Sequence, residues 1–451
     1  MSEDLRELAR RGLEWIKNRP AKGLEAELYL SRAEERGLER REGRPDGASE
    51  AVAEGVGLRL AAGGRMGFAC GAGLSLETIS GLFAKASAQL DHLEPDLAKV
   101  FVAGSSTPVD EAFAATLWDD SLFTEDWNAF LPKLTDMEQI VLAADPRLSS
   151  VIRAGYGESR GEVVIANTLG LSTWERGGSA SVGLSALCSE GDERQTGSSF
   201  RSARRKDALD FTTAAREAAA RATSLLGARK LPTGTRAVIF DPWVAGELLE
   251  LVAGLLCADQ VQRGKSLLAG KLGKRVGSEL VTFVDDPRRP AGMASSLFDD
   301  EGCPTRKKVM IENGVVREYF YDAYTANREG RASNACAGRG SYRGLPSPGS
   351  SNFYLAPGKT KREELMAQTK DGLLVLDIMG MHMADPISGE FSVGVSGLAV
   401  SGGAATHPVK SAMISGNLVE LLDRVDLVAD DLTFYGSLGA PTFRVSSMTV
   451  A

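Results

Sequence analysis

The chain has 451 residues, of which 43% are hydrophobic and 25% charged, with a formal net charge of −8 and a pI near 5.3. This composition is that of a folded globular protein, and the acidic balance argues against a nucleic-acid-binding surface, which usually carries a basic excess. No apolar run approaches the roughly 18 residues that cross a membrane. Because one core rarely extends over such a length, we expect two domains.

The cysteines indicate a cellular compartment. There are five, an odd number, and they are widely scattered at Cys70, Cys188, Cys257, Cys303 and Cys336. This pattern favours reduced thiols in the cytoplasm over a disulfide framework.

The first half alternates between predicted strands and helices. The N-terminal 19 residues predict a charged amphipathic helix rather than a signal peptide. Alternating segments at 27–30, 55–60, 161–168 and 173–188 predict strands, and apolar periodicity predicts helices at 76–90, 124–143 and 206–226. The stretch 95–120 reads as irregular. We therefore expect a mixed α/β layer over residues 1–230.

The second half opens after a linker-like stretch, 227–236, which is rich in Gly, Pro and basic residues. A buried strand is predicted at 237–240, then a helix over 242–259, and mostly strands and turns follow. The expected fold class is α/β (α+β), with a strand-rich C-terminal domain over residues 231–451.

The helix predicted from residue 242, PWVAGELLELVAGLLCAD, has the outline of a metallopeptidase helix without its histidines. Such a helix carries His-Glu-x-x-x-His, in which two imidazoles hold zinc and the Glu takes a proton from the bound water. Here the Glu is Glu250, and the ligand positions hold Leu249 and Gly254, neither of which can coordinate a metal. At 100° per residue Glu250 and Gly254 lie opposite the apolar side, so periodicity alone favours a surface helix with solvated Glu residues.

Three other motifs have plainer interpretations. Gly157-Glu158-Ser159-Arg160-Gly161 matches a nucleophile elbow, but strand-like residues follow where a helix is required. The acidic run Asp299-Asp300-Glu301 could form a hard-cation site with Asp285 and Asp286, although without the ligand spacing of a calcium loop it predicts a loop tip. Met379, Met381 and Met383 alternate, which predicts a strand with methionines packed on one side in preference to a soft-metal site.

Several longer segments of the second half resemble the TldD/PmbA family, the so-called modulators of DNA gyrase. They are SSLFDDEGCPTRKKVMIENGVVREYFYDAYTANREG from 295, GRGSYRGLPSPGSSNFYL from 338, DPISGEFSVGVSGLAVSGG from 385 and HPVKSAMISGNLVELL from 407. The first half matches more loosely, through GVGLRLAAGGRMGFA.

The resemblance implies a function and a site. In that family TldD-type subunits carry zinc and PmbA-type (TldE) partners do not, and together they form a cytoplasmic peptidase that trims unfolded peptides. The family's third ligand, a Cys, falls on Tyr435, so all three ligand positions, Leu249, Gly254 and Tyr435, lack a ligand while Glu250 is kept. The resemblance thus implies a metal-free TldE-like subunit with no catalytic residues of its own. Zinc is expected only in a TldD-like partner, although the segment SYRGLPSPGSSN is more similar to the zinc-bearing type.

The Gly/Ser/Pro-rich loop around Arg343, Pro346, Pro348 and Asn352 is a type that often positions ligands. We hypothesise that Glu250, Arg343, Pro348 and Asn352 line the peptide cleft or the partner interface, with Arg343 meeting a carboxylate or a carbonyl. The alternative is a crossover that only spaces two strands.

Two further functions stay open: a homodimeric peptide-binding or scaffold protein, and an enzyme that uses Glu250 in different chemistry. For the favoured function we expect an unfolded peptide as ligand and a TldD-like subunit or a second copy as partner, with neither nucleic acid nor membrane.

Overall fold

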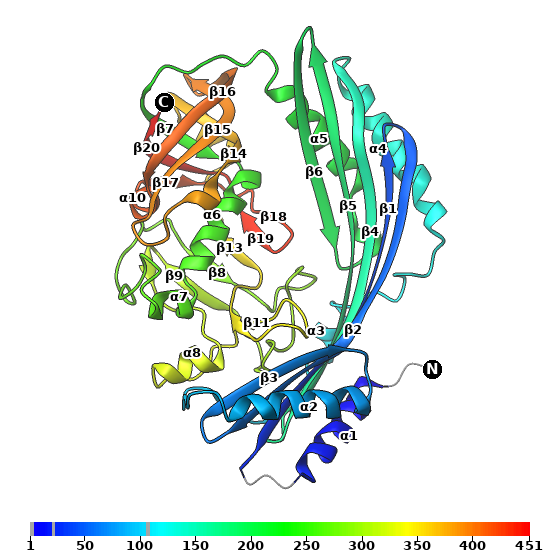
Figure 1. Ribbon diagram of the computed structural model, residues 1–451. Helices are drawn as coiled ribbons and strands as arrows, with labels where there is room; N and C mark the ends of the chain where they lie inside the picture. Colours follow the sequence, from blue (N-terminus) through cyan, green and yellow to red (C-terminus); the bar gives the residue numbers. More distant parts are fainter. Residues whose placement is uncertain (1–3, 20–22, 105–108) are drawn as a thin grey trace.

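The computed structural model describes residues 4–19, 23–104 and 109–451, so residues 1–3 of the predicted first helix lie outside it. The protein is α+β, as expected, with a long N-terminal sheet and a strand-rich C-terminal region (Figure 1). Among the described residues no helix combines the length and the apolar character needed to cross a bilayer.

The N-terminal sheet has six antiparallel strands in the order β3-β2-β1-β4-β5-β6. They are β1 (Glu25–Arg41), β2 (Arg44–Ala62), β3 (Arg65–Ala72), β4 (Leu148–Asn167), β5 (Ser172–Glu190) and β6 (Glu193–Ala203). The predicted strands fall on β1, β2, β4 and β5, but most of these strands are much longer than the predicted segments. The Gly157–Gly161 motif lies inside β4, which confirms that it is not a strand-to-helix elbow.

Two hydrophobic cores lie at opposite ends of this sheet. Helices α1 (Leu5–Lys17) and α2 (Leu76–Leu90) pack on one end, and α4 (Leu131–Ala144) and α5 (Phe211–Ser224) pack on the other. Between them the strands are held by ion pairs across neighbouring strands, such as Arg36–Glu158 at 2.7 Å and Arg160–Glu34 at 2.6 Å. Opposite charges on adjacent strands stabilise pairing without burying apolar surface. This explains why apolar alternation alone predicts only parts of these strands.

The C-terminal region contains a sheet that closes on itself. Its strand order is β16-β15-β14-β7-β20-β17, with an additional pairing of β16 to β20 that completes a small barrel. The strands are β7 (Gly234–Phe240), β14 (Asp371–Met379), β15 (Glu390–Ser401), β16 (Ala404–Asn417), β17 (Val425–Val428) and β20 (Phe443–Val450). The predicted boundary at 230/231 falls in the stretch 225–233, which joins α5 to β7.

A second sheet, in the order β10-β9-β8-β13-β19-β18, packs beside the barrel. Its strands are β8 (Phe283–Asp285), β9 (Lys308–Glu312), β10 (Val315–Val316), β13 (Phe353–Leu355), β18 (Thr433–Tyr435) and β19 (Leu438–Ala440), and β11 (Ala337–Gly338) pairs with β12 (Ser347–Pro348) outside it. Helix α6 (Pro242–Leu255) contacts both sheets and shares their core.

Short helices fill the connections. They are α3 (Glu111–Ala114), α7 (Ala258–Gln262), α8 (Ala323–Arg328), α9 (Arg362–Ala367), α10 (Leu418–Asp423) and the 3₁₀ turns η1 (Trp127–Phe130), η2 (Lys206–Ala208) and η3 (Met381–Met383).

The predicted methionine strand is wrong. Strand β14 ends at Met379, Gly380 takes a φ of 94°, and Met381 to Met383 form the turn η3. As a result Met381 is buried whereas Met379 and Met383 are exposed. The left-handed conformation at Gly380, which glycine adopts without steric cost, is what ends the strand.

Candidate functional site

Helix α6 begins with a strong capping arrangement. The Asp241 carboxylate accepts a hydrogen bond from the Trp243 N–H at 3.0 Å, and Pro242 follows at the first helical position, where no N–H is needed. The helix ends at Leu255, so the predicted extension to residue 259 is wrong. A chain reversal follows, and a separate helix, α7, begins at Ala258.

One face of α6 opens on a hollow of about 830 Å³, here called the α6 hollow. It is bounded by α6, the start of α7, β12 and the connection between β14 and β15. Its lining residues are Glu247, Glu250, Leu251, Gly254, Leu255, Cys257, Asp259, Gln260, Lys265, Ser347, Pro348, Met381 and Pro386. The hollow therefore joins carboxylates to apolar walls, and its volume is in the range of ligand sites.

Three residues predicted to belong to the site, Glu250, Gly254 and Pro348, meet at this hollow. Glu250 is exposed and forms no hydrogen bond or ion pair with any residue that the structure describes. In contrast, Leu249 is fully buried in the C-terminal core.

Tyr435 lies in different surroundings, between α6 and the N-terminal sheet. Its ring packs edge-on against Trp243 with centroids 4.8 Å apart, and its hydroxyl accepts a hydrogen bond from Arg221 of α5 at 3.0 Å. Arg221 also stacks on the Trp243 ring at 3.9 Å. Tyr435 thus joins the two halves of the chain.

The Gly/Ser/Pro-rich loop lies between two hollows. Its Ser347 and Pro348 line the α6 hollow, and Gly349 to Ser351 line a second one. Arg343 is exposed and stacks on Tyr342. Asn352 is fully buried, and its amide donates hydrogen bonds to the Asp286 carbonyl and the Ser295 hydroxyl. Of the loop residues predicted for a cleft, only Pro348 lines the α6 hollow.

The second hollow, of about 290 Å³, lies between β4 and β5 of the N-terminal sheet and loops of the C-terminal region. Burial raises the pKa of Glu175 to about 7, and burial together with the nearby Glu301 raises the pKa of Asp299 to about 7. In its wall Asp285 forms a fully buried ion pair with Lys308 at 3.2 Å.

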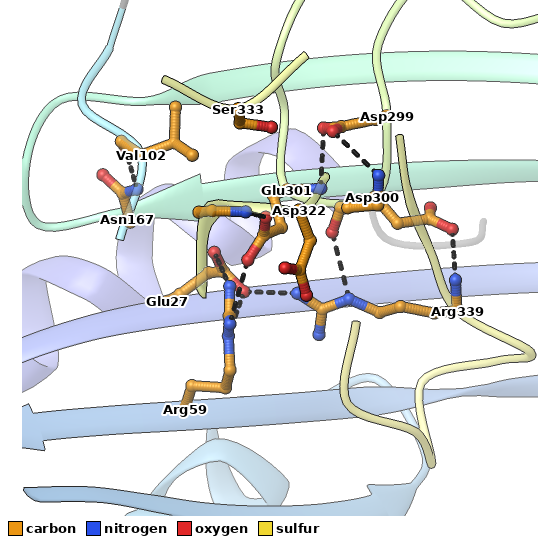
Figure 2. Close-up of polar contacts among 12 residues, drawn as sticks. Glu27, Arg59, Val102, Asn167, Asp299, Asp300, Glu301, Asp322, Ser333 and Arg339 are labelled. Atoms are coloured by element: carbon orange, nitrogen blue, oxygen red, sulfur yellow. Dashed lines mark hydrogen bonds and ion pairs between the residues drawn. The ribbon is translucent and has the colours of Figure 1, made fainter. Parts of the chain in front are cut away.

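The acidic run 299–301 lies in a loop, as predicted, but burial shows that it does not form the tip of that loop. Asp299 and Glu301 are buried. Figure 2 shows the cause: Glu27 lies between Arg59, at 2.7 Å, and Arg339, at 2.6 Å, and Arg59 also reaches Glu301 at 3.3 Å. The carboxylates of the run are satisfied by these cations and by backbone N–H groups, such as that of Ala323 with Glu301.

Sequence reasoning missed this ion network, although it leaves a signal. Arg59 is the single charged residue of the apolar segment GVGLRLAA, and Glu27 stands between Ala26 and the apolar run Leu28-Tyr29-Leu30. A charge in such a strand is rarely buried unless it is paired, so two of opposite sign on separate strands suggest a buried pair.

The residues at the metallopeptidase positions do not fit a zinc ion. Leu249 has no donor atom and is enclosed by the core, Gly254 has no side chain, and the Tyr435 hydroxyl is engaged with Arg221. Over residues 4–19, 23–104 and 109–451, no three His, Cys, Asp or Glu side chains come together as metal ligands. The Cys257 thiol in the hollow is no substitute, because burial raises its pKa to about 12.

Fold and site together define an α+β protein with a large mixed polar and apolar hollow on one helix. Sequence models of three PmbA/TldA metallopeptidase domains match the chain: domain 1 over residues 26–90, the central domain over 119–226 and the C-terminal domain over 233–451. The chain belongs to the PmbA/TldD metallopeptidase family, which confirms the resemblance seen in the sequence.

Individual relatives agree with this. The chain is 26% identical to a metalloprotease TldD homolog of Buchnera aphidicola over 86% of this chain and 81% of that one. It is 36% identical to a metalloprotease of Methanocaldococcus jannaschii, but that match spans only 49% of each chain, about half the relative's length. A crystal structure of a candidate modulator of DNA gyrase from Thermotoga maritima superposes with a TM-score of 0.88 at 27% identity, covering 99% of this chain and all of that one.

Proposed function

We propose that this chain is the metal-free, TldE/PmbA-like subunit of a TldD/TldE-type metallopeptidase complex that degrades or trims unfolded peptides. In this role the chain binds substrate and completes the peptide chamber, while a TldD-like partner supplies zinc. The observation that carries the proposal is the state of α6: Glu250 faces a hollow, but Leu249 is buried and Gly254 has no donor. Without imidazole or thiolate ligands nothing offsets the cost of dehydrating zinc.

The proposal includes a cytoplasmic location, for which the five free cysteines are the support. It includes no contact with DNA, because the net charge of −8 repels a polyanion.

A test begins with the chain alone. Metal analysis of the purified chain should find far less than one zinc per molecule, and the chain alone should leave unfolded peptides uncut. Mixing it with a zinc-bearing TldD-type relative from the same host should give cleavage that a chelator abolishes. Stoichiometric zinc, or chelator-sensitive cleavage by the isolated chain, would contradict the proposal.

A second candidate is a homodimeric peptide-binding protein that needs no catalytic partner. It is supported by the α6 hollow, which the residues of a single chain form. Copurification from the native host separates the two: a zinc-bearing relative in the complex favours the first function, and a pure homodimer favours the second.

The third function, catalysis by Glu250 in different chemistry, can be separated by Glu250→Ala. If the isolated chain hydrolyses any peptide and this variant abolishes the reaction, the chain is an enzyme in its own right.

A further inference from the structure

The connection between β14 and β15, residues 380–389, forms one wall of the α6 hollow through Met381 and Pro386. It is fastened beside α6, because η3 packs on this helix and the Leu267 N–H donates to the Pro386 carbonyl at 2.8 Å. The Asn417 side chain donates to the Ser388 carbonyl at 2.8 Å and fixes the far end. Hydrogen bonds therefore fix this segment in place beside α6.

The wall and the strands beside it expose four apolar side chains, here called the methionine rim: Met379 at the end of β14, Met383 and Ile387 in the connection, and Met413 on β16. Their exposed fractions run from 47% at Met413 to 78% at Met383. The sheet register pairs Met379 with Gly394 and Gly394 with Met413, so both methionines flank a glycine on one face. Gly380 directly follows Met379 in the chain. The Met383 sulfur lies 4.0 Å from the position that a Cβ of Gly380 would take, so the Met383 side chain folds back toward the end of β14.

The composition of the methionine rim indicates what kind of ligand it binds. Clustered exposed apolar side chains usually mark a binding site, and methionine, which is unbranched and flexible, adapts to partners of different shape. A single rigid partner would be matched better by branched or aromatic side chains. The rim therefore favours a variable, extended ligand.

The charge of the α6 hollow indicates that the ligand also carries a cationic group. Among the described residues its lining includes the carboxylates of Glu247, Glu250 and Asp259 and one cation, Lys265, and Asp259 also lies 3.8 Å from Arg263. Next to the carboxylates lie apolar walls such as Leu251 and Pro348, which lower the local dielectric and strengthen the attraction for a cation. Glu250 has no internal partner among the described residues, so it is available to a ligand.

We propose that the α6 hollow and the methionine rim together bind an extended peptide segment in which Lys or Arg stands beside large apolar side chains. The cation enters the hollow and meets Glu250, and the apolar side chains lie on the rim. This rests on the proposed function, because it names the substrate class of the same site. A hollow of about 830 Å³ holds several side chains at once.

The test uses the full-length chain and three labelled, unstructured peptides of equal length. One repeats Arg and Leu with Gly and Ser spacers, one has Glu in place of Arg, and one has Ser in place of Leu. In fluorescence anisotropy the first should bind about tenfold more tightly than either of the others. Glu250→Gln should weaken the binding of the Arg/Leu peptide about fivefold and reduce the salt dependence of that binding. The double variant Met379→Ser with Met383→Ser should weaken the binding of the same peptide without changing its salt dependence.

Matched controls lie outside the α6 hollow and the methionine rim. Glu363→Gln on α9 and Val52→Ser on β2 replace an exposed carboxylate and an exposed apolar side chain, and should leave all three affinities unchanged. Thermal unfolding of every variant shows whether it is folded.

The remaining outcomes separate this inference from the proposed function. If all peptides bind alike to the chain and to its variants, and the chain still supports cleavage by its partner, the inference is overturned and the function stands. If the double methionine variant converts a dimer to a monomer in light scattering but binds peptide normally, the rim is a contact between copies, and the inference is again overturned.

Discussion

Two buried carboxylates, Glu27 and Glu175, show how neighbours decide the ionisation of a side chain. Burial works against the ionised form of Glu27, yet Arg59 and Arg339 hold its pKa below the usual value. Among the residues that the structure describes, no guanidinium lies at ion-pair distance from Glu175, so burial raises its pKa to about 7, despite a hydrogen bond from the Leu297 N–H. Glu27 is therefore a permanent anion, whereas Glu175 changes its charge near neutral pH.

Glu175 makes stability depend on pH in a direction that can be derived. Its pKa is about 7 in the folded chain and about 4.3 in an unfolded one, so the folded state holds the proton more tightly. The stabilisation is complete below about pH 4 and is lost as pH rises to 7. Glu175→Gln, which mimics the protonated form, should match the native chain at pH 4 and exceed its stability at pH 8 by about 1–3 kcal/mol.

Urea unfolding at both pH values measures this difference. Exposed Glu363→Gln is the control and should change stability equally at the two values. A Glu175→Gln variant that loses stability at pH 8 would show that the carboxylate is ionised there and usefully paired.

At the scale of elements, α6 contains a glycine that the helix does not require. Gly254 has helical geometry, and a Cβ built on it meets no atom within 4 Å. Gly254→Ala should therefore stabilise the fold by about 0.5–1 kcal/mol, because glycine loses more backbone entropy in a helix. Gly397→Ala in β15 is the contrasting variant, since its Cβ would lie 1.9 Å from the Leu374 carbonyl oxygen, and it should destabilise strongly. Chemical denaturation of both variants checks the pair.

Strand β2 has two parts with different stability. Residues 55–62 lie between β1 and β3, whereas residues 44–53 pair with β1 alone and are all exposed. Segments with few buried apolar contacts open locally at low free energy. Hydrogen exchange followed by mass spectrometry should find 44–53 exchanging much faster than 55–62. Equal protection of both parts would mean that another surface covers the outer part in solution.

The sequence identified most elements but not their lengths or their contacts. Apolar alternation located β1, β2, β4 and β5, yet their charged middles continue as strand because Arg36 and Arg160 meet Glu158 and Glu34 on neighbouring strands. The helix pattern placed Glu250 and Gly254 on one side, which the structure confirms at the α6 hollow. The position of Tyr435 depends on contacts with Arg221, more than 200 residues away, and no local pattern contains it.

At the scale of the molecule, the N-terminal sheet and the C-terminal region are joined by apolar clusters, by surface ion pairs and by two larger polar networks. One is the network of Glu27, Arg59, Glu301 and Arg339, and the other is the packing of Arg221 against Trp243 and Tyr435. Arg204 adds to the first contact by donating hydrogen bonds to carbonyls of the 292–295 loop, including that of Met293 at 2.6 Å. Both contacts are polar and specific, so they fix one arrangement of the halves.

These contacts predict the cooperativity of unfolding. Removing Glu27 takes the paired carboxylate away from buried Arg339 and leaves buried Arg59 with Glu301 alone, a change that costs about 3–5 kcal/mol. Since each half has its own core, the combined variant Glu27→Ala with Arg221→Ala should uncouple them. Calorimetry should then show two separate transitions where the native chain shows one. Arg10→Ala, which removes only exposed ion pairs on α1, should keep a single transition close to the native temperature. A single transition in the combined variant would mean that the apolar contacts between the halves, not the ionic ones, make the molecule cooperative.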